Sequence, residues 1–366
     1  MIKIVRTDQE LECPVIDKTL IDKGMDLVLL PDEIDEDALI EAVRDADLLL
    51  MCYTPITENV INAASKLKAI VKYGVGIDAI DIEAAKARGI PVVNIPEYAE
   101  RTVAEGAFTL MIALAKRLIP MDRAMHANDW IWPETAWRGA DIAGKTVGLI
   151  GAGKIAQSMA QMAGAGFGAR VIGYSPHSSP ERMRENGIKP IESLNQVMAE
   201  SDFVSIHCVL NDETKHLIGR DQLAAMKQSA YLINTARGAI VDEMALLDAL
   251  QNGRIAGAGL DVYSREPLNQ TDHPLRALYD MDNVILLPHL TFFTEDAMDR
   301  LEQETLDRCF EALEGRPVLV KSTDPRLRGQ TKGVAFSDTQ SSGLLSNHFD
   351  GHIPKRRYYA HIRSVP

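Results

Sequence analysis

The stretch that decides the fold is KTVGLIGAGKIA, Lys145–Ala156, near the middle of the chain. An apolar run of strand type leads into Gly151, Gly153 and Ala156, which form the pattern G-x-G-x-x-G/A and precede a helix-like run. The first glycine permits a tight turn, the second lets a pyrophosphate approach the backbone, and the third small residue lets helix and strand pack. A structural turn can carry the same glycines, but the strand-loop-helix context favours a dinucleotide site.

On both sides of this stretch, short apolar or β-branched runs alternate with helical ones. That alternation predicts βαβ units and parallel sheets. Before residue 97 the predicted strands include Met25–Leu30, Asp47–Cys52, Ala69–Val71 and Pro91–Asn94. The later ones are Thr146–Ile150, Arg170–Tyr174, Phe203–His207, Tyr231–Asn234, Ala256–Asp261 and Val284–Leu287. The later runs are almost continuously apolar, as expected where helices cover both faces of a sheet.

Two predicted helices connect the two series. Thr102–Leu118 has apolar residues at helical spacing, and Thr102 and Glu105 stand in the arrangement of a capping box. A final amphipathic helix is predicted at Thr294–Leu313. We therefore expect a small domain built from both ends of the core chain, with a second domain inserted between them.

Composition and charge exclude several classes of protein. The 366 residues suggest about two domains, and 46% hydrophobic with 25% charged residues is typical of a globular chain. A net charge of -13 repels phosphate backbones, so we expect no nucleic-acid partner. The four cysteines are widely spaced, and no signal peptide or membrane-spanning run is visible. We expect a cytoplasmic protein with no disulfide framework, metal site or membrane partner.

The last stretch, 322–366, has no sustained hydrophobic period and holds seven basic and three acidic residues. A basic tail on an acidic body suggests docking within or between subunits. A partly disordered tail is at least as compatible with this composition.

The choice of dinucleotide depends on Ser175, which follows the strand after the glycine loop. An NAD site usually presents an acid there to the ribose diol. Because Ser175 is uncharged and Arg182 lies nearby in sequence, NADP remains a candidate. No arginine directly follows Ser175, which favours NAD slightly.

Three polar or charged residues follow predicted strands of the second series: Arg237, Glu266 and His289. Each by itself is compatible with a surface or structural role. Strand ends of an open parallel sheet line the ligand crevice, however, and the glycine loop enters the same crevice. Their convergence therefore predicts an active site.

From about residue 45 to 315 the chain resembles the D-isomer-specific 2-hydroxyacid dehydrogenase family. The matching runs are YGVGIDAID at Tyr73–Asp81, RTVAEGA at Arg101–Ala107, the glycine loop, HCVLNDETKHLI at His207–Ile218, NTARG at Asn234–Gly238, GLDVYSREP at Gly259–Pro267 and the final Pro288-His289. The resemblance implies an α/β fold with two Rossmann-like parallel-sheet domains. The cofactor domain, 101–290, would be inserted into a discontinuous flavodoxin-like substrate-binding domain, 1–100 and 291–321.

The resemblance also implies roles for the three strand-end residues. Arg237 would grip the substrate carboxylate and polarise its carbonyl, His289 would be the acid/base, and Glu266 would be its partner. Hydride transfer to a 2-oxo group builds negative charge on oxygen, so a proton donor and a fixed cation act mainly in the transition state. Histidine exchanges a proton near neutral pH, and the guanidinium fork suits a carboxylate.

Further contacts are implied by the same resemblance. In the Gly74-Val75-Gly76 turn, Val75 and Gly76 would bind the substrate carboxylate, unless the turn only joins strand and helix. Tyr98 and Phe292 would line an apolar substrate pocket, or else pack between the domains. Implied cofactor contacts, besides the glycines, Ala156 and Ser175, are Lys154, Ile155, Val209, Thr214, Thr235, Ala236, Asp261 and Thr102, the last of which could equally be only a helix cap. A homodimer through the cofactor domain is also implied, with Trp130, Trp132 and Trp137 reaching across.

The substrate class follows partly from an absence. The resemblance places the arginine with which phosphoglycerate dehydrogenases bind the substrate phosphate in Leu50–Thr54, and this segment has none. That disfavours 3-phosphoglycerate, because a buried dianion needs a cation. We expect a small 2-oxo or 2-hydroxy acid with a neutral side chain and NAD or NADP as cofactor. The alternatives are a D-3-phosphoglycerate dehydrogenase and a dinucleotide-sensing interaction protein of the corepressor type, which the basic tail favours.

Overall fold

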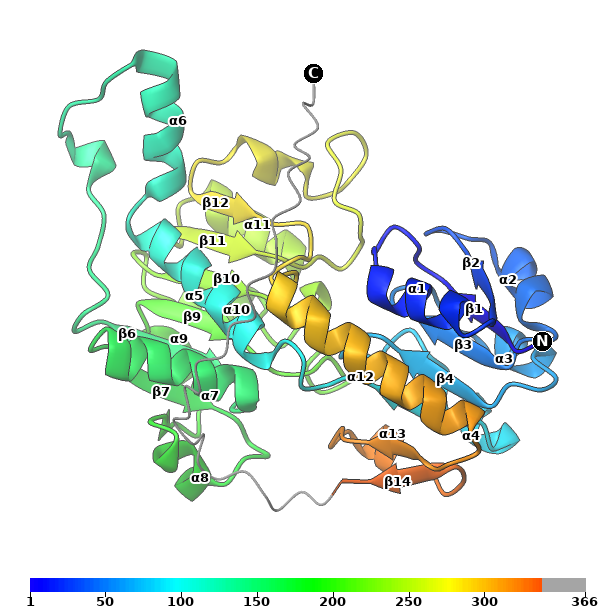
Figure 1. Ribbon diagram of the computed structural model, residues 1–366. Helices are drawn as coiled ribbons and strands as arrows, with labels where there is room; N and C mark the ends of the chain where they lie inside the picture. Colours follow the sequence, from blue (N-terminus) through cyan, green and yellow to red (C-terminus); the bar gives the residue numbers. More distant parts are fainter. Residues whose placement is uncertain (338–366) are drawn as a thin grey trace, which may run out of the picture.

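The computed structural model describes residues 1–337, which form two units lying side by side (Figure 1). The N-terminal unit contains a five-stranded sheet in the order β2-β1-β3-β4-β5, and the central unit a seven-stranded sheet in the order β12-β11-β10-β9-β6-β7-β8. Every strand pairing in both sheets is parallel. The predicted α/β architecture with parallel sheets is confirmed. The first order is flavodoxin-like, and the second begins with the Rossmann order.

In the N-terminal unit, helices cover both faces of a buried sheet. Strands β3 and β4 are buried along their whole length, which explains their continuous apolar runs. The strands are β1 Lys3–Arg6, β2 Asp26–Leu29, β3 Leu48–Met51, β4 Ala69–Lys72 and β5 Val92–Asn94. The helices are α1 Pro14–Asp22, α2 Glu36–Val43, α3 Glu58–Ala63, α4 Ile82–Arg88 and α12 Glu295–Leu313. Side chains from α12 complete the core, so both ends of the chain build this unit.

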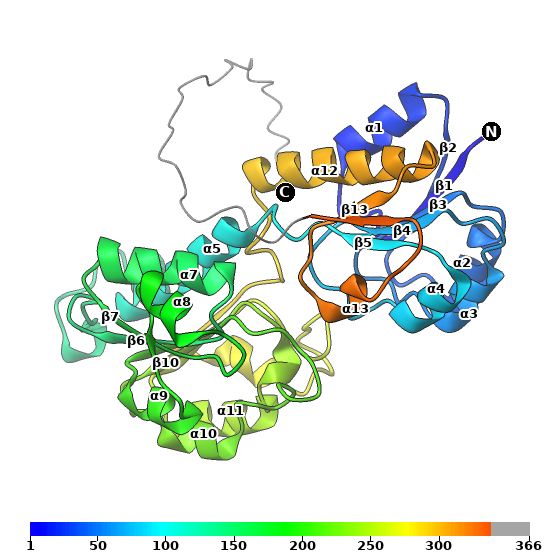
Figure 2. The same cartoon turned by 90° about the horizontal axis from the view of Figure 1, so that it is seen from below.

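The central unit has helices on both faces of its sheet (Figure 2). Its strands are β6 Thr146–Ile150, β7 Arg170–Tyr174, β8 Lys189–Pro190, β9 Phe203–Ile206, β10 Tyr231–Asn234, β11 Gly257–Leu260 and β12 Val284–Leu286. Its helices are α5 Glu100–Ala115, α7 Lys154–Ala160, α8 Pro180–Glu185, α9 Leu194–Glu200, α10 Arg220–Ala225 and α11 Glu243–Gln251, with short turns η1 Thr135–Trp137, η2 Gln161–Gly166, η3 Gly238–Ile240 and η4 Arg276–Asp280. The strand order reverses beside β6, the point at which such sheets bind ligands.

The predicted capping box at the start of α5 is wrong. Helix α5 begins at Glu100, so Thr102 already lies within its first turn, and Glu105 pairs with Arg101 at 3.0 Å. The hydroxyl of Thr102 instead accepts a hydrogen bond from Arg300 of α12 at 3.3 Å. This contact joins the two helices that connect the units.

Residues 318–337, here called the C-terminal segment, pack against the N-terminal unit (Figure 2). They form β13 Val318–Val320, α13 Pro325–Arg328 and β14 Val334–Phe336. The side-chain amide of Gln330 accepts from the amide of Val92 at 2.7 Å and donates to its carbonyl at 2.8 Å, while Leu327 is fully buried. The segment thus satisfies edge strand β5, so 322–337 differ from the predicted tail. The rest of that tail, 338–366, lies outside the described residues.

Helix α6, Leu118–Asn128, projects away from the central sheet (Figure 1). None of its residues is buried. Trp130 and Trp132, which follow it, are 62% and 74% exposed. Within residues 1–337, no helix combines the length and the apolar character needed to cross a membrane.

Candidate active site

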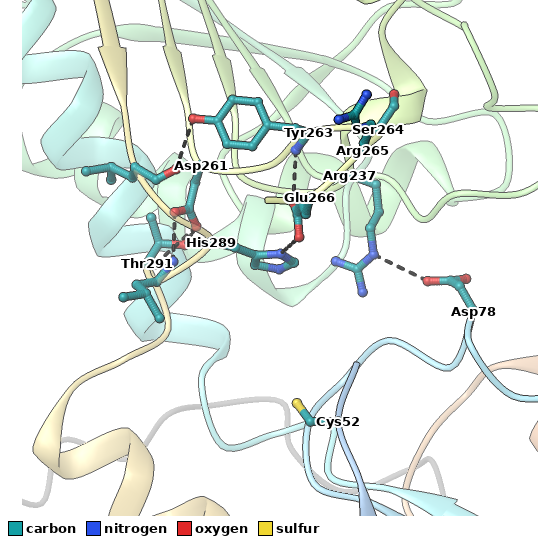
Figure 3. A network of polar contacts seen from close by, with 12 residues as sticks. Cys52, Asp78, Arg237, Asp261, Tyr263, Ser264, Arg265, Glu266, His289 and Thr291 are labelled. Carbon is teal, nitrogen blue, oxygen red and sulfur yellow. Dashed lines mark hydrogen bonds and ion pairs between the residues drawn. The ribbon is translucent and has the colours of Figure 1, made fainter. Parts of the chain in front are cut away.

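Arg237, Glu266 and His289 meet at one edge of the central sheet, facing the N-terminal unit (Figure 3). They follow β10, β11 and β12, which are neighbours in the sheet. Carboxyl ends of adjacent parallel strands share an edge, which is why residues far apart in sequence come together here.

Glu266 is held from two sides. Its Oε1 accepts from the amide of Tyr263 at 2.9 Å, and its Oε2 lies 2.9 Å from Nδ1 of His289. Burial raises the pKa of Glu266, but the hydrogen bond and charge of His289, the amide of Tyr263 and the charge of Arg237 together outweigh burial, so the pKa of Glu266 lies below its usual value. An ionised carboxylate only accepts, so Nδ1 of His289 carries the hydrogen. Nε2 is left to exchange a proton with a ligand.

The backbone of His289 is strained and is fixed from behind. Its φ of 61° lies in the left-handed region, which residues other than glycine rarely adopt. The carboxylate of Asp261, only 1% exposed, accepts from the amides of Leu290 and Thr291 at 2.8 and 3.0 Å and from the Thr291 hydroxyl at 2.6 Å. Asp261 therefore holds the turn that aims His289, a role that sequence reasoning missed. Its cofactor contact stays a prediction.

Arg237 lies against the Gly74-Val75-Gly76 turn of the N-terminal unit. Its Nη1 donates to the carbonyl of Ala236 at 2.7 Å and its Nε to Asp78 at 3.3 Å. A Cβ on Gly76 would lie 1.8 Å from Nη2, so only glycine permits this approach. The side chain of Asn94 donates to the carbonyl of Val75 at 2.6 Å and steadies the turn. A guanidinium beside a glycine turn is suited to binding a carboxylate.

Lys72 is a charged group near this site that sequence reasoning missed. It is 5% exposed, and its Nζ donates to the carbonyl of Cys52 at 2.5 Å and lies 3.1 Å from Cys52 Sγ. It also lies 5.4 Å from the ring centre of Tyr53, whose ring meets that of His289 edge-on at 5.7 Å. A lysine closing an otherwise apolar strand, AIVK, was the available signal.

The glycine loop after β6 fits a dinucleotide. Gly151 has φ 98°, and a Cβ there would lie 2.8 Å from the backbone of Cys208. Around Gly153 a Cβ would meet no atom within 4 Å, so the space beside the loop is open. Ala156 is buried against the sheet, and the buried hydroxyl of Thr235 has no hydrogen-bond partner among the described residues. Open space and an unpaired hydroxyl are what a bound dinucleotide would need.

Other predicted cofactor residues have hydrogen-bond or ion-pair partners within the protein. Ser175 shares a 2.8 Å hydrogen bond with Ser178, and Lys154 pairs with Glu97 at 2.7 Å. The hydroxyl of Thr214 donates to the carbonyl of Val209 at 2.6 Å. Ile155 and Ala236 are half-buried. Their cofactor contacts stay predictions.

Tyr98 and Phe292 pack together in the core of the N-terminal unit. Their rings meet edge-on at 6.1 Å, and Phe292 also packs against Phe293 at 6.0 Å. Both side chains are almost fully buried. This placement favours packing over a pocket wall, and contact with a substrate stays a prediction.

Comparison with known proteins gives a consistent result. A family model described as "D-isomer specific 2-hydroxyacid dehydrogenase, NAD binding domain" matches residues 108–291. The glyoxylate reductase of Korarchaeum cryptofilum is 36% identical over 324 residues, which are 87% of this chain and 96% of that protein.

Two further relatives bear on the length and the fold. The D-3-phosphoglycerate dehydrogenase of Methanocaldococcus jannaschii is 38% identical over 298 residues, 81% of this chain but 55% of that protein. The chain thus spans about half the length of the phosphoglycerate dehydrogenases it matches. The NAD-complexed D-isomer specific 2-hydroxyacid dehydrogenase of Lactobacillus delbrueckii ssp. bulgaricus has a similar structure, with a TM-score of 0.70, 30% identity, and coverage of 86% of this chain and 98% of that one.

Proposed function

Because the chain belongs to the D-isomer-specific 2-hydroxyacid dehydrogenase family, we propose that it interconverts a 2-oxo acid and the D-2-hydroxy acid with a nicotinamide dinucleotide. The observation that carries this proposal is the His289–Glu266 pair, 2.9 Å apart, on the same sheet edge as Arg237. A proton donor and a carboxylate-binding cation on one edge are what reduction of a 2-oxo acid requires.

In the proposed mechanism, Arg237 and the Gly74–Gly76 turn hold the substrate carboxylate. His289 gives the proton on Nε2 to the carbonyl oxygen as negative charge develops there, and takes it back in the reverse direction. Glu266 stays ionised, keeps the ring oriented and stabilises its charged form. The glycine loop and Thr235 would hold the dinucleotide, which supplies or accepts the hydride.

We propose a small 2-oxo acid with a neutral side chain as the substrate. The segment Leu50–Thr54 carries no cation, and the name glyoxylate reductase of one relative is consistent with such a substrate. Lys72 supports a second candidate, 3-phosphohydroxypyruvate. Its buried ammonium lies beside Cys52 of that segment, and its hydrogen-bond partners among the described residues are the carbonyl and Sγ of Cys52. The name of the Methanocaldococcus relative agrees with that candidate.

We propose NAD as the cofactor, with NADP as the alternative. Ser175 is already bonded to Ser178, and neither side chain carries a charge that would attract a 2′-phosphate. The neighbouring His177 pairs with Glu213 at 3.0 Å, which adds an acid to this surface.

The experiment that tests the function follows nicotinamide absorbance with purified protein, NADH and NADPH in parallel. Glyoxylate, pyruvate, hydroxypyruvate, 2-oxoisocaproate and 3-phosphohydroxypyruvate are the substrates. We expect turnover with a small neutral 2-oxo acid and a preference for NADH. A preference for the phosphorylated acid would select the second candidate. Cofactor binding without turnover of any acid would contradict the proposed enzymatic function and favour a dinucleotide-sensing protein.

We propose a homodimer formed through the projecting α6 and the segment after it. Trp130 and Trp132 are exposed and meet edge-on at 6.3 Å, and apolar side chains of this size are enriched in interfaces. Sedimentation of the wild-type chain and of Trp130→Ser/Trp132→Ser tests this. We expect a dimer that the double substitution weakens, and a monomeric wild type would contradict it.

A cytoplasmic location is also proposed. Cys13, Cys52, Cys208 and Cys309 are all free, which suits a reducing compartment. Cell fractionation would test it, and recovery outside the cytoplasm would contradict it.

A further inference from the structure

A chain of charged side chains runs from the C-terminal segment to the candidate active site. Arg326 of α13 lies 3.7 Å from Oδ1 of Asp78, and Oδ2 of Asp78 accepts from Nε of Arg237 at 3.3 Å (Figure 3 draws the second contact). The three residues come from the C-terminal segment, the turn after β4 and the end of β10. These two ion pairs therefore connect a segment beyond α12 with Arg237, the group proposed to hold the substrate carboxylate.

Two of the three guanidinium nitrogens of Arg237 have hydrogen-bond partners among the described residues. Asp78 holds Nε and the carbonyl of Ala236 holds Nη1. Nη2 points at Gly76, where even a methyl group would collide with it. A guanidinium fixed at Nε can still offer Nη2 to an anion. Asp78 thus lies on the Nε–Nη2 edge of Arg237, close to the glycine turn, since a Cβ on Gly76 would also lie 3.3 Å from Oδ2 of Asp78.

Arg326 is itself held in place. Asp324 caps α13 by accepting from the amide of Arg326 at 2.9 Å, and its two carboxylate oxygens accept from Nε and Nη2 of Arg326 at 3.1 and 2.8 Å. Two cations and two carboxylates therefore alternate along this series of ion pairs. Removing Arg326 would leave both carboxylates underpaired and would make the surroundings of Arg237 more negative, which disfavours an anionic substrate.

We propose that Asp78 and Arg326 are positioning residues for Arg237. Asp78 sets the orientation in which Nη2 faces the glycine turn, and Arg326 balances the charge of Asp78. The proposal rests on the proposed function of Arg237, and it gives the C-terminal segment a part in substrate affinity. Since all three side chains are partly exposed, solvent screens both ion pairs, and they contribute little to stability. The effect belongs to binding and orientation rather than to folding.

The test compares Asp78→Ala, Arg326→Ala and Arg326→Lys with Lys332→Ala. Lys332 lies in the same segment, and its substitution removes the same charge without touching Asp78. We expect the KM for the 2-oxo acid to rise about fivefold to tenfold in Asp78→Ala and less in Arg326→Ala. Arg326→Lys should recover part of the loss, and Lys332→Ala should match the wild type. The KM for the dinucleotide should not change in any variant.

Backbone hydrogen exchange without substrate gives a second readout that needs no turnover. Amides in 74–78 and 236–238 should exchange faster in Arg326→Ala than in Lys332→Ala. If no acid is turned over but exchange changes as expected, the proposed function fails and the positioning link stands. Unchanged exchange together with an unchanged KM, or a lower KM in Asp78→Ala, would overturn the link. A lower KM would mean that Asp78 competes with the substrate for Arg237.

Discussion

The central unit and the N-terminal unit meet at the candidate active site, but they contribute different kinds of residue. On the central side, Arg237, Glu266 and His289 follow three neighbouring strands, and each stands within a recognisable run of sequence. On the other side, Gly76 and Asp78 come from one turn, and the contact of Asp78 with Arg237 joins residues 159 positions apart. In the proposed mechanism the central unit supplies the reacting groups, and the N-terminal unit fixes where one of them, Arg237, points.

This difference predicts different consequences for substitutions on the two sides. Losing a reacting group removes an interaction made mainly in the transition state, so the rate of the chemical step falls. Losing a positioning contact misplaces a group that is still present, so KM changes more than kcat. The following predictions test that division, beginning with the largest effect.

The largest effect is expected for His289→Asn. Asparagine cannot exchange a proton at neutral pH, so kcat should fall about 10²- to 10⁴-fold, the usual contribution of general acid–base catalysis. Dinucleotide binding, measured by fluorescence titration, should persist because the glycine loop is untouched. His126→Asn, on the exposed α6, is the control and should keep wild-type rates. A near-normal kcat in His289→Asn would show that the central unit does not supply the proton donor through His289.

Gly76→Ala tests the opposite side. The new Cβ would lie 1.8 Å from Nη2 of Arg237 and must displace the guanidinium. A misplacement of about 1 Å can cost about 100-fold, and we expect most of this loss in the KM for the 2-oxo acid. Gly166→Ala is the control, because a Cβ there meets no atom within 4 Å. A loss confined to kcat would contradict the division between the two sides.

Asp261→Asn should have a smaller effect, because it weakens the hydrogen bonds that hold the turn behind His289 and leaves His289 itself in place. One of the two oxygens that accept from Leu290 and Thr291 becomes an amide, which cannot accept. We expect a loss of about 1–3 kcal/mol in the free energy of unfolding, measured by urea denaturation, with a reduced kcat. Asp282→Asn, at an exposed position, should change neither quantity. Full stability in Asp261→Asn would show that these hydrogen bonds do not hold the turn.

The sequence predicts the central side better than the N-terminal side for a physical reason. The ends of parallel strands share an edge, so three strand-end residues could be brought together from spacing alone. The start of α5 could not be predicted this way, because tertiary contacts place Thr102 against Arg300 of α12 and no local signal announces that. Nor could the fold of 322–337, in which Gln330 pairs with edge strand β5 and Leu327 is buried in the core of the N-terminal unit.

The burial of individual side chains could not be predicted from the sequence either. Tyr98 and Phe292 are apolar residues of the kind that line a pocket, but the structure places both in the core that the N-terminal elements form with α12. Lys72 ends an apolar strand, where a lysine usually indicates an exposed position, yet its ammonium is buried beside Cys52. In each case the deciding neighbour is distant in sequence.

The smallest effect concerns the pH dependence of stability at Glu266. Its pKa in the folded protein lies below the unfolded value of about 4.3, because His289, the amide of Tyr263 and the charge of Arg237 together outweigh burial. The unfolded chain therefore binds a proton more readily than the folded one. The stabilisation from Glu266 is complete above about pH 4.3 and is lost as the pH falls through the lower, folded pKa.

Glu266→Gln removes that dependence. The Tm of the wild type should exceed that of Glu266→Gln near neutral pH, and the difference should shrink as the pH falls below about 4. Glu213→Gln breaks another Glu–His pair, with His177, whose side chains are both well exposed, so solvent screens it and its Tm difference should stay flat. A Tm difference for Glu266→Gln that does not change with pH would mean that the carboxylate gains nothing from His289 on folding. The central side would then have to orient its histidine by shape alone, through Asp261 and the strained backbone, as the N-terminal side orients Arg237.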